Sequence, residues 1–344
     1  MRAFQIVEPH TVELRDVPVP EPGPGQVLLK IGGAGACHTD LHIMDEPANG
    51  PSGRFPFTLG HENAGWVEQL GPGATGFAPG DPVIVYGAWG CGTCPSCRMG
   101  MDNYCEVNGG LGGGVGGNNG GMAPYMVVPA TRFLVPLGTL DPRDVAPLSD
   151  AALTSYHVVK RSLHLLGPGS TAVVIGAGGL GQMAIQVLRA LSSATTIVAL
   201  DTAADKLATA KRLGADEALV SGDEAVKRIK DITRGQGAQL VLDFVGVDPT
   251  LRMAAQVARV RGHLTIVGGG GGALPVNLFS PPYECSVAST YNGSITELME
   301  VVTLAQAGKI QMLVEHFPLE RAGQAYQLLR DGKIPGRAVM TPNG

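Results

Sequence analysis

Three side chains from separated parts of this sequence could together bind a catalytic metal ion. They are Cys37, His61 and Asp150. One thiolate, one imidazole and one carboxylate form the ligand set of a catalytic zinc site, which keeps a fourth position open for water or substrate. A structural explanation stays open as well, because a histidine or a cysteine can be buried in a core and Asp150 can cap a helix that begins at residue 151.

A second group of potential metal ligands is local. Four thiolates with the spacing C-x2-C-x2-C-x7-C can close a tetrahedral site without an open position, as in structural zinc. An iron–sulfur cluster also begins with C-x2-C-x2-C, but the fourth spacing is wrong for it and no second set follows. A nucleic-acid-binding zinc ribbon is disfavoured by the acidic charge balance. The four ligands of the predicted structural zinc are Cys91, Cys94, Cys97 and Cys105.

A glycine motif predicts a dinucleotide site. Gly176, Gly178 and Gly181 form GxGxxG between a strand predicted at 171–175 and a helix predicted at 182–191. In this context the glycines allow the backbone to approach a pyrophosphate at the N-terminus of a helix. A glycine-rich turn without a ligand is the structural alternative.

An acidic residue in the next strand selects the cofactor. Asp201 ends a strand predicted at 197–201, twenty positions after Gly181, where it can accept hydrogen bonds from the adenosine ribose. A carboxylate at this point repels a 2′-phosphate, and no arginine follows at 202–204 to hold one. NAD is therefore favoured over NADP.

The elements that must position these residues differ between the two halves. Alternation of apolar and polar residues, with frequent Pro and Gly, predicts short strands and a compact β-barrel over 1–35 and 59–86. From residue 145 onward helical patterns alternate with buried strands, which predicts a parallel, doubly wound sheet. Residues 108–121, mostly glycine and asparagine, are expected to form a mobile surface loop.

Composition limits the class of protein. The chain has 344 residues, enough for two domains, with 44% hydrophobic and 16% charged residues, which is typical of a soluble globular protein. The net charge of −5 and the lack of a basic block disfavour nucleic acid as a partner. No apolar run reaches the ~18 residues that span a bilayer, and the N-terminus lacks a signal-peptide core. We expect a cytoplasmic protein without a membrane partner.

Taken together, these motifs resemble the zinc-dependent medium-chain alcohol dehydrogenases, close to bacterial secondary-alcohol dehydrogenases. The likeness runs nearly from end to end. It rests on Cys37-His38-Thr39-Asp40-Leu41-His42, Gly60-His61-Glu62, the four-cysteine segment, the GxGxxG motif with Asp201, and Pro335-Gly336-Arg337.

The resemblance implies an α/β fold of two domains. A GroES-like β-barrel catalytic domain would comprise 1–150 and 289–344 and carry the structural zinc lobe at about 90–106. A Rossmann domain of 151–288 would bind NAD(H). The resemblance further implies two zinc ions per chain and a homotetramer, with a homodimer as the alternative and 286–292 as a contact region.

The resemblance also implies roles for single residues. Cys37, His61 and Asp150 would bind the catalytic zinc, with Glu62 behind them or as an alternate ligand. Thr39 would receive the substrate proton, and His42 would end the relay. The residues expected at the cofactor are His38, Thr154, Gly176, Gly178, Gly179, Leu180, Gly181, Asp201, Lys206, Phe244, Val267, Gly268 and Arg337, with His38 and Arg337 facing the pyrophosphate.

Two positions depart from the family pattern. Many members have cysteine where Asp150 stands. A carboxylate carries the same charge as a thiolate, but it is a harder ligand for a metal ion. Pro124 stands where an acidic residue is common, and we have no functional account of it.

The expected reaction is reversible hydride transfer between an alcohol, expected to be secondary, and NAD, with zinc lowering the pKa of the alcohol. The substrate pocket is expected between the domains, and its candidate lining residues are Tyr86, Trp89, Tyr291 and Asn292, for which core packing is the alternative.

A polyol or sugar dehydrogenase is the nearest rival function. A zinc-independent quinone or enone reductase and a non-catalytic regulatory protein are more distant, since neither needs Cys37 with His61 and the four-cysteine segment.

Overall fold

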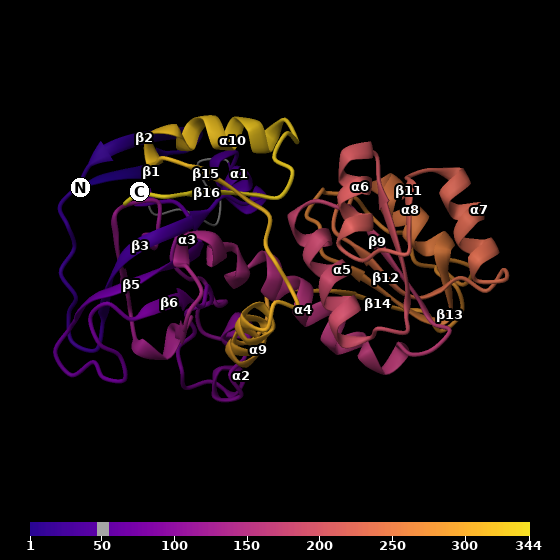
Figure 1. Cartoon of the computed structure of the whole chain (residues 1–344), viewed down its shortest axis with the longest axis horizontal. Coiled ribbons are helices and arrows are strands. Elements are labelled where there is room, and N and C mark those ends of the chain that lie inside the picture. Colours follow the sequence, from indigo (N-terminus) through magenta and orange to yellow (C-terminus); the bar gives the residue numbers. More distant parts are fainter. Residues whose placement is uncertain (47–54) are drawn as a thin grey trace. The chain divides into compact units, whose positions relative to one another are not determined.

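The computed structural model describes residues 1–46 and 55–344, which form two compact units (Figure 1). The first unit consists of Met1–Leu153, Asn292–Ala307 and Met312–Gly344, so both termini belong to it. The second consists of Thr154–Tyr291 with Gly308–Gln311. The predicted domain limits differ from these units by a few residues at each junction, and they did not anticipate that Gly308–Gln311 lie with the second unit.

The first unit is built on two sheets, as the alternating pattern of the N-terminal half predicts. A three-stranded sheet has the order β2-β1-β4, and a larger sheet has the order β15-β16-β3-β5-β6-β8, with β7 paired to β3. The strands are β1 (Arg2–Glu8), β2 (Thr11–Asp16), β3 (Val27–Gly35), β4 (Phe57–Thr58), β5 (Glu62–Leu70), β6 (Pro82–Val85), β7 (Tyr125–Val128), β8 (Leu134–Pro136), β15 (Val314–Phe317) and β16 (Arg337–Met340).

The pairing of β3 with β5 prepares the candidate metal site. The two strands are antiparallel, and their register places Gly35 opposite Glu62. Cys37 follows the end of β3 and His61 precedes the start of β5, so this register brings the two residues to the same edge. Gly35 is required there, because a Cβ atom at this position would overlap the Glu62 carboxylate.

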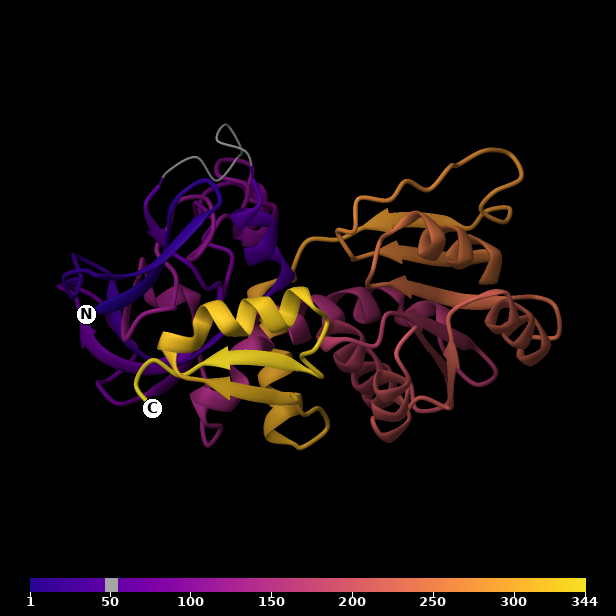
Figure 2. The same ribbon diagram turned by 90° about the horizontal axis from the view of Figure 1, so that it is seen from above.

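Helices of the first unit pack against these sheets. The last helix of the chain, α10 (yellow in Figures 1 and 2), precedes the final strand β16 and contacts α1. The helices of this unit are α1 (His38–Met44), α2 (Pro95–Arg98), α3 (Pro142–Val145), α9 (Ile295–Gln306) and α10 (Ala322–Arg330), with short 3-10 turns η1 (Asp102–Tyr104), η2 (Thr131–Phe133), η3 (Ala146–Ser149) and η5 (Leu319–Arg321). Helix α4 (Ala151–Ser162) begins in the first unit and continues into the second.

The second unit contains a six-stranded parallel sheet of order β11-β10-β9-β12-β13-β14. This order reverses direction at β9, and because crossovers are right-handed, the helices cover both faces of the sheet. The predicted doubly wound sheet is therefore confirmed. Its elements are β9 (Thr171–Ile175), β10 (Thr196–Asp201), β11 (Glu217–Val220), β12 (Ala238–Asp243), β13 (Ala258–Ile266), β14 (Ser286–Ser289), η4 (Leu163–Leu165), α5 (Gly179–Leu191), α6 (Ala204–Arg212), α7 (Asp223–Ile232) and α8 (Asp248–Val257).

The core of the second unit lies between this sheet and its helices. Val173, Val198 and Val241 from the central strands are completely buried, together with Ile229 of α7 and Val257 of α8.

Among the described residues, none of the helices combines the length and the hydropathy of a membrane-spanning segment.

Candidate active site

Four potential ligands of a metal ion converge in the first unit. Ligand atoms of Cys37, His61, Glu62 and Asp150 all lie within 4.8 Å of one another. Cys37 Sγ is 3.5 Å from Asp150 Oδ2, and His61 Nε2 is 3.8 Å from the same oxygen. Zinc bonds of 2.0–2.3 Å at tetrahedral angles separate neighbouring ligands by roughly 3.3–3.8 Å. The three residues predicted from separated segments therefore fit one zinc ion.

Local structure explains how each ligand is presented. Cys37 is the N-cap residue of α1, directly after β3. His61 follows Gly60, whose positive φ of 93° turns the chain into β5. Asp150 ends η3 just before α4, and its side chain points to the ligand cluster.

Asp40 holds two of these ligands in place. It is completely buried, and its Oδ1 lies 2.9 Å from His61 Nδ1 while its Oδ2 accepts a hydrogen bond of 2.9 Å from the backbone N–H of Cys37. With the proton on Nδ1, the lone pair of His61 Nε2 remains for the metal. Burial alone lowers the pKa of His61, but the Asp40 charge and the contacts with Asp150 and Cys37 raise it well above its usual value. Sequence reasoning assigned Asp40 no role, although its place three residues after Cys37 is that of a helix-capping side chain.

Charge in the cluster is balanced by one arginine. Arg337, on β16, is 3% exposed, and its Nη2 lies 2.8 Å from Glu62 Oε1 and 3.5 Å from Asp150 Oδ2. Burial raises the pKa of Glu62 to about 8 despite the opposing effect of Arg337. For Asp150 the effect of burial is outweighed by hydrogen bonding to His61 and by the charges of His61 and Arg337, so its pKa is lowered. Both carboxylates lie within reach of one metal ion, and Asp150 is the one in contact with Cys37 and His61. The predicted contact of Arg337 with a pyrophosphate stays a prediction.

The three residues predicted to contact substrate and cofactor from α1 are exposed. His38, Thr39 and His42 lie on the outer side of this helix, while Asp40 and Leu41 are buried. Thr39 Oγ1 is 3.7 Å from Cys37 Sγ, which places the hydroxyl beside the candidate metal ligands.

The four cysteines of the predicted structural site also converge. Their sulfur atoms all lie within 4.8 Å of one another, with Cys91 Sγ 4.0 Å from Cys97 Sγ. Backbone N–H groups donate to two of the sulfurs: Thr93 to Cys91 at 3.4 Å and Val107 to Cys105 at 3.4 Å. Hydrogen bonds from Thr93 and Cys94 lower the pKa of the Cys91 thiol to about 6, which favours the thiolate that zinc requires. The described residues include all six cysteines of the chain, and none of them forms a disulfide.

The glycine-rich segment differs from its expected form. Gly112, Gly113, Gly114, Gly120 and Gly121 are buried, and the segment packs against the backbone that leads to His61. The N–H of Gly120 donates to Thr58 at 2.7 Å, and that of Gly121 donates to Gly60 at 3.0 Å. A Cβ atom at Gly114 would come within 2.5 Å of the Gly60 carbonyl and 2.9 Å of His61 N. The absence of side chains here therefore serves close backbone packing.

In the second unit, the three motif glycines have three different surroundings. Gly176 has a positive φ of 90° directly after β9. A Cβ atom at Gly178 would meet nothing within 4 Å, which leaves the backbone open to a ligand, whereas one at Gly181 would overlap the Gly176 carbonyl. Helix α5 begins at Gly179 with its N-terminal N–H groups at this loop. This is the arrangement that binds a pyrophosphate.

Other predicted cofactor residues lie at the carboxyl ends of neighbouring strands. Asp201 ends β10, Phe244 follows β12, and Val267 and Gly268 follow β13. Open α/β sheets bind ligands at this edge, where the strand order reverses. Asp201 Oδ2 accepts from the N–H of Ala177 at 2.8 Å, so the carboxylate is held against the glycine loop. Thr154 is buried in α4, Leu180 lies in the first turn of α5, and Lys206 lies in α6.

The substrate-pocket candidates fall into two groups. Tyr86 is completely buried and donates to the Gly293 carbonyl at 2.7 Å, so it belongs to the core of the first unit, the alternative expected from the sequence. Trp89 is partly buried and donates to the Tyr86 carbonyl at 3.1 Å. Tyr291 is 46% exposed, and Asn292 has a positive φ of 53°.

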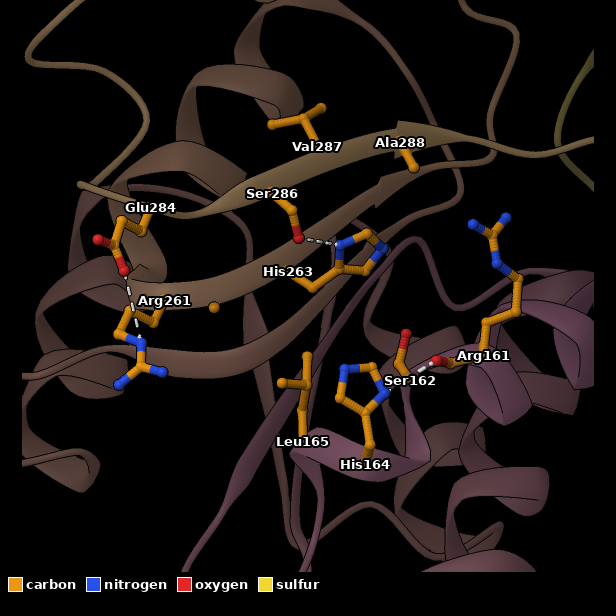
Figure 3. Close-up of a pocket in the computed structure, with 11 residues that line it drawn as sticks. Arg161, Ser162, His164, Leu165, Arg261, His263, Glu284, Ser286, Val287 and Ala288 are labelled. Atoms are coloured by element: carbon orange, nitrogen blue, oxygen red, sulfur yellow. Dashed lines mark hydrogen bonds and ion pairs between the residues drawn. The ribbon is translucent and has the colours of Figure 1, made fainter.

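A separate pocket of about 510 Å³ lies in the second unit, beside β14 (Figure 3). Arg161, His164, Arg261 and His263 line it, so its walls carry mainly basic groups. Burial, followed by the charges of Arg161 and His164, lowers the pKa of His263. None of the residues predicted for catalysis or cofactor binding lines this pocket.

Comparison with known proteins agrees with this geometry. Residues 23–139 match the alcohol dehydrogenase GroES-like domain, and residues 179–307 match the zinc-binding dehydrogenase domain. An NAD-dependent alcohol dehydrogenase of Sulfurisphaera tokodaii is 35% identical, over 99% of this chain and 100% of that protein. A D-arabinose 1-dehydrogenase (NADP(+)) of Saccharolobus solfataricus is 36% identical, over 97% of this chain and 95% of that protein.

A solved structure shows the same fold throughout. The alcohol dehydrogenase of Aeropyrum pernix superposes with a TM-score of 0.91 and 35% identity, over 99% of this chain and 100% of that one. Both domain families, the full-length relatives and the two sets of metal ligands lead to one conclusion. The chain belongs to the family of zinc-dependent medium-chain alcohol dehydrogenases.

Proposed function

We propose that this chain catalyses the reversible oxidation of an alcohol, preferably a secondary one, with NAD as the hydride acceptor. The observation that carries the proposal is the convergence of Cys37, His61 and Asp150 at ligand distances, in a chain that also has the glycine motif and Asp201. A structural core would have no need for one thiol, one imidazole and one carboxylate in contact.

Each residue has a defined task in this reaction. Zinc bound by the three ligands would supply a Lewis acid that polarises the alcohol or carbonyl oxygen. Thr39 accepts the proton of the alcohol, and His42, one helical turn further along α1, passes it to solvent. Bound NAD⁺ would supply the acceptor, C4 of its nicotinamide, for the hydride that leaves the carbinol carbon with its electron pair. The alcohol is thereby oxidised, NAD⁺ is reduced, and one proton is released.

The nearest rival is a sugar or polyol dehydrogenase. One relative is named as a D-arabinose 1-dehydrogenase (NADP(+)), so this chemistry occurs on the same fold. Asp201 supports NAD rather than NADP here, because its charge opposes a 2′-phosphate. Activity with a panel of secondary alcohols, ketones, polyols and aldoses, each with both cofactors, separates the two functions.

The test combines metal content with two ligand variants. We expect two zinc ions per chain in the wild type, and one in Cys37→Ser and His61→Ala, because the four-cysteine site is independent of these ligands. Both variants should lose at least about 10³-fold in turnover, since the chain's own residues cannot replace a Lewis acid. NADH binding, followed by fluorescence, should persist. Near-wild-type turnover in either variant would contradict the ligand assignment.

We further propose that the chain acts in the cytoplasm as a homotetramer. A cytoplasmic location is supported by four reduced cysteines at one metal site, which suits a reducing compartment. Assembly is supported by exposed apolar side chains in the segment before β14, where Val276 is 69% exposed, Leu278 72% and Phe279 80%. Apolar groups exposed to this extent along one segment are typical of a protein contact.

A further inference from the structure

The Asp40 carboxylate, which contacts His61 and Cys37, has a third hydrogen-bond partner from a distant part of the chain. Asp40 is completely buried, and its Oδ2 accepts a hydrogen bond of 2.8 Å from the hydroxyl of Tyr326 in addition to that from Cys37 N. Its other oxygen lies 2.9 Å from His61 Nδ1. Tyr326 is in α10, 286 residues further along the chain.

The surroundings of Tyr326 fix its hydroxyl on Asp40. The side chain is 4% exposed, and its ring stacks on Phe4 with centroids 5.9 Å apart and an angle of 16° between the planes. The Met122 sulfur, 3.2 Å away, is the other atom within hydrogen-bond range of the hydroxyl that the structure records. Burial and the Asp40 charge hold the pKa of Tyr326 well above its usual value, so the hydroxyl keeps its proton and donates it.

We propose that Tyr326 is a positioning residue of the catalytic metal site, acting through Asp40 on His61 and Cys37. The inference rests on the proposed function, because it assigns a role toward the zinc that these ligands would bind. Tyr326 touches neither substrate nor metal in this arrangement. Its hydroxyl orients the Asp40 carboxylate, and that carboxylate orients His61 and Cys37.

The physical argument concerns the rotation of the carboxylate. His61 Nδ1 binds one oxygen of Asp40, and two donors on the other oxygen define the plane of the group. Without the Tyr326 hydroxyl, Oδ2 keeps only the backbone N–H of Cys37, and the carboxylate can turn away from the imidazole. Direct partners of metal-binding histidines change metal affinity by 10–100-fold. Tyr326 is one contact further from the metal than Asp40. We therefore expect its loss to weaken metal binding by about 10-fold, the lower end of that range.

The decisive variant is Tyr326→Phe, which removes one oxygen and keeps the stacked ring. A matched control is Tyr86→Phe, because Tyr86 is also completely buried in the first unit but donates to the Gly293 carbonyl rather than to Asp40. A second control is Phe4→Leu, which removes the stacking partner and leaves the hydroxyl. In each variant the zinc dissociation constants of both sites are measured by competition with a chromophoric chelator.

We expect the catalytic zinc of Tyr326→Phe to bind about 10-fold more weakly, with the four-cysteine zinc unchanged. Tyr86→Phe should bind the catalytic zinc as tightly as the wild type. Phe4→Leu should weaken this zinc less than Tyr326→Phe does. With cobalt at the catalytic site, Tyr326→Phe should also shift the visible absorption bands, which a purely structural role would not do.

Two results would overturn the inference alone. One is unchanged catalytic-zinc affinity in Tyr326→Phe, and the other is an equal loss in Phe4→Leu, which would mean that packing is responsible. A wild-type chain that holds only the four-cysteine zinc would overturn the proposed function, and this inference with it. Metal analysis of the wild type therefore separates the two failures before any variant is compared.

Discussion

At the scale of single residues, two histidines near the candidate metal site have opposite surroundings. His61 is largely buried and bound to Asp40, whereas His42 lies on the exposed side of α1. Only His42 can exchange protons with water, so we expect His42→Ala to slow alcohol oxidation about 10-fold near pH 6.5. The loss should shrink above pH 9, where hydroxide can remove the proton instead. The measurement is the pH profile of kcat/KM.

The control for this prediction is His10→Asn. His10 is also an exposed histidine of the first unit, and asparagine tolerates its positive φ of 65°. This variant should keep the wild-type profile. An unchanged profile in His42→Ala would remove His42 from the proton relay, whereas equal loss in both variants would indicate a general effect of lost surface charge.

At the scale of elements, the glycine-rich segment is expected to hold in place the backbone just before β5, where His61 lies. Gly114 and Gly109 both have positive φ, at 83° and 66°, so an alanine at either position carries a similar backbone strain of about 1 kcal/mol. They differ in their neighbours: a Cβ atom at Gly114 meets Gly60 and His61 N, and one at Gly109 meets nothing within 4 Å. Gly114→Ala should therefore displace His61 and weaken the catalytic zinc about 10-fold more than Gly109→Ala does.

Zinc competition and thermal unfolding of the two variants test this explanation. Both variants should lower Tm through the shared backbone strain, and Gly114→Ala should lower it further because only its Cβ atom overlaps backbone atoms. Only Gly114→Ala should also weaken the catalytic zinc. If both variants bind the catalytic zinc equally well, the segment is a spacer without influence on the ligand.

At the scale of the whole molecule, the proposed homotetramer depends on the apolar segment before β14. Phe279 is 80% exposed, and a serine there should weaken the contact between copies enough to yield dimers or monomers at micromolar concentration. Light scattering after size-exclusion chromatography measures the mass. Val220→Ser is the control, because Val220 is 62% exposed on β11, at the opposite edge of the same sheet. A tetramer that survives Phe279→Ser would place the contact elsewhere.

Sequence patterns predict much of this protein because its chemistry is coded locally. The four cysteines lie within fifteen residues, so their spacing alone defines a closed metal site. The strand, GxGxxG motif and helix follow one another directly, and Asp201 ends the next strand, as the structure confirms for β9, α5 and β10. The family likeness then joins Cys37, His61 and Asp150, which no local pattern connects.

Tertiary structure decided what depends on contacts between distant residues. The antiparallel register of β3 and β5 brings Cys37 beside His61, and the turn before α4 adds Asp150. The glycine-rich segment was expected to be mobile, but its packing depends on the backbone around Gly60, which composition cannot reveal.

The hydroxyl of Tyr326 meets Asp40 only because α10 returns to α1 after the second unit is complete. A buried carboxylate takes its donors from whatever the fold places around it, and a single tyrosine in an amphipathic helix carries no sign of that partner. The sequence by itself thus determined the family and the cofactor motif, and it predicted the metal ligands. The tertiary structure decided which side chains stand behind those ligands, because hydrogen bonds in a core depend on three-dimensional neighbours rather than on spacing along the chain.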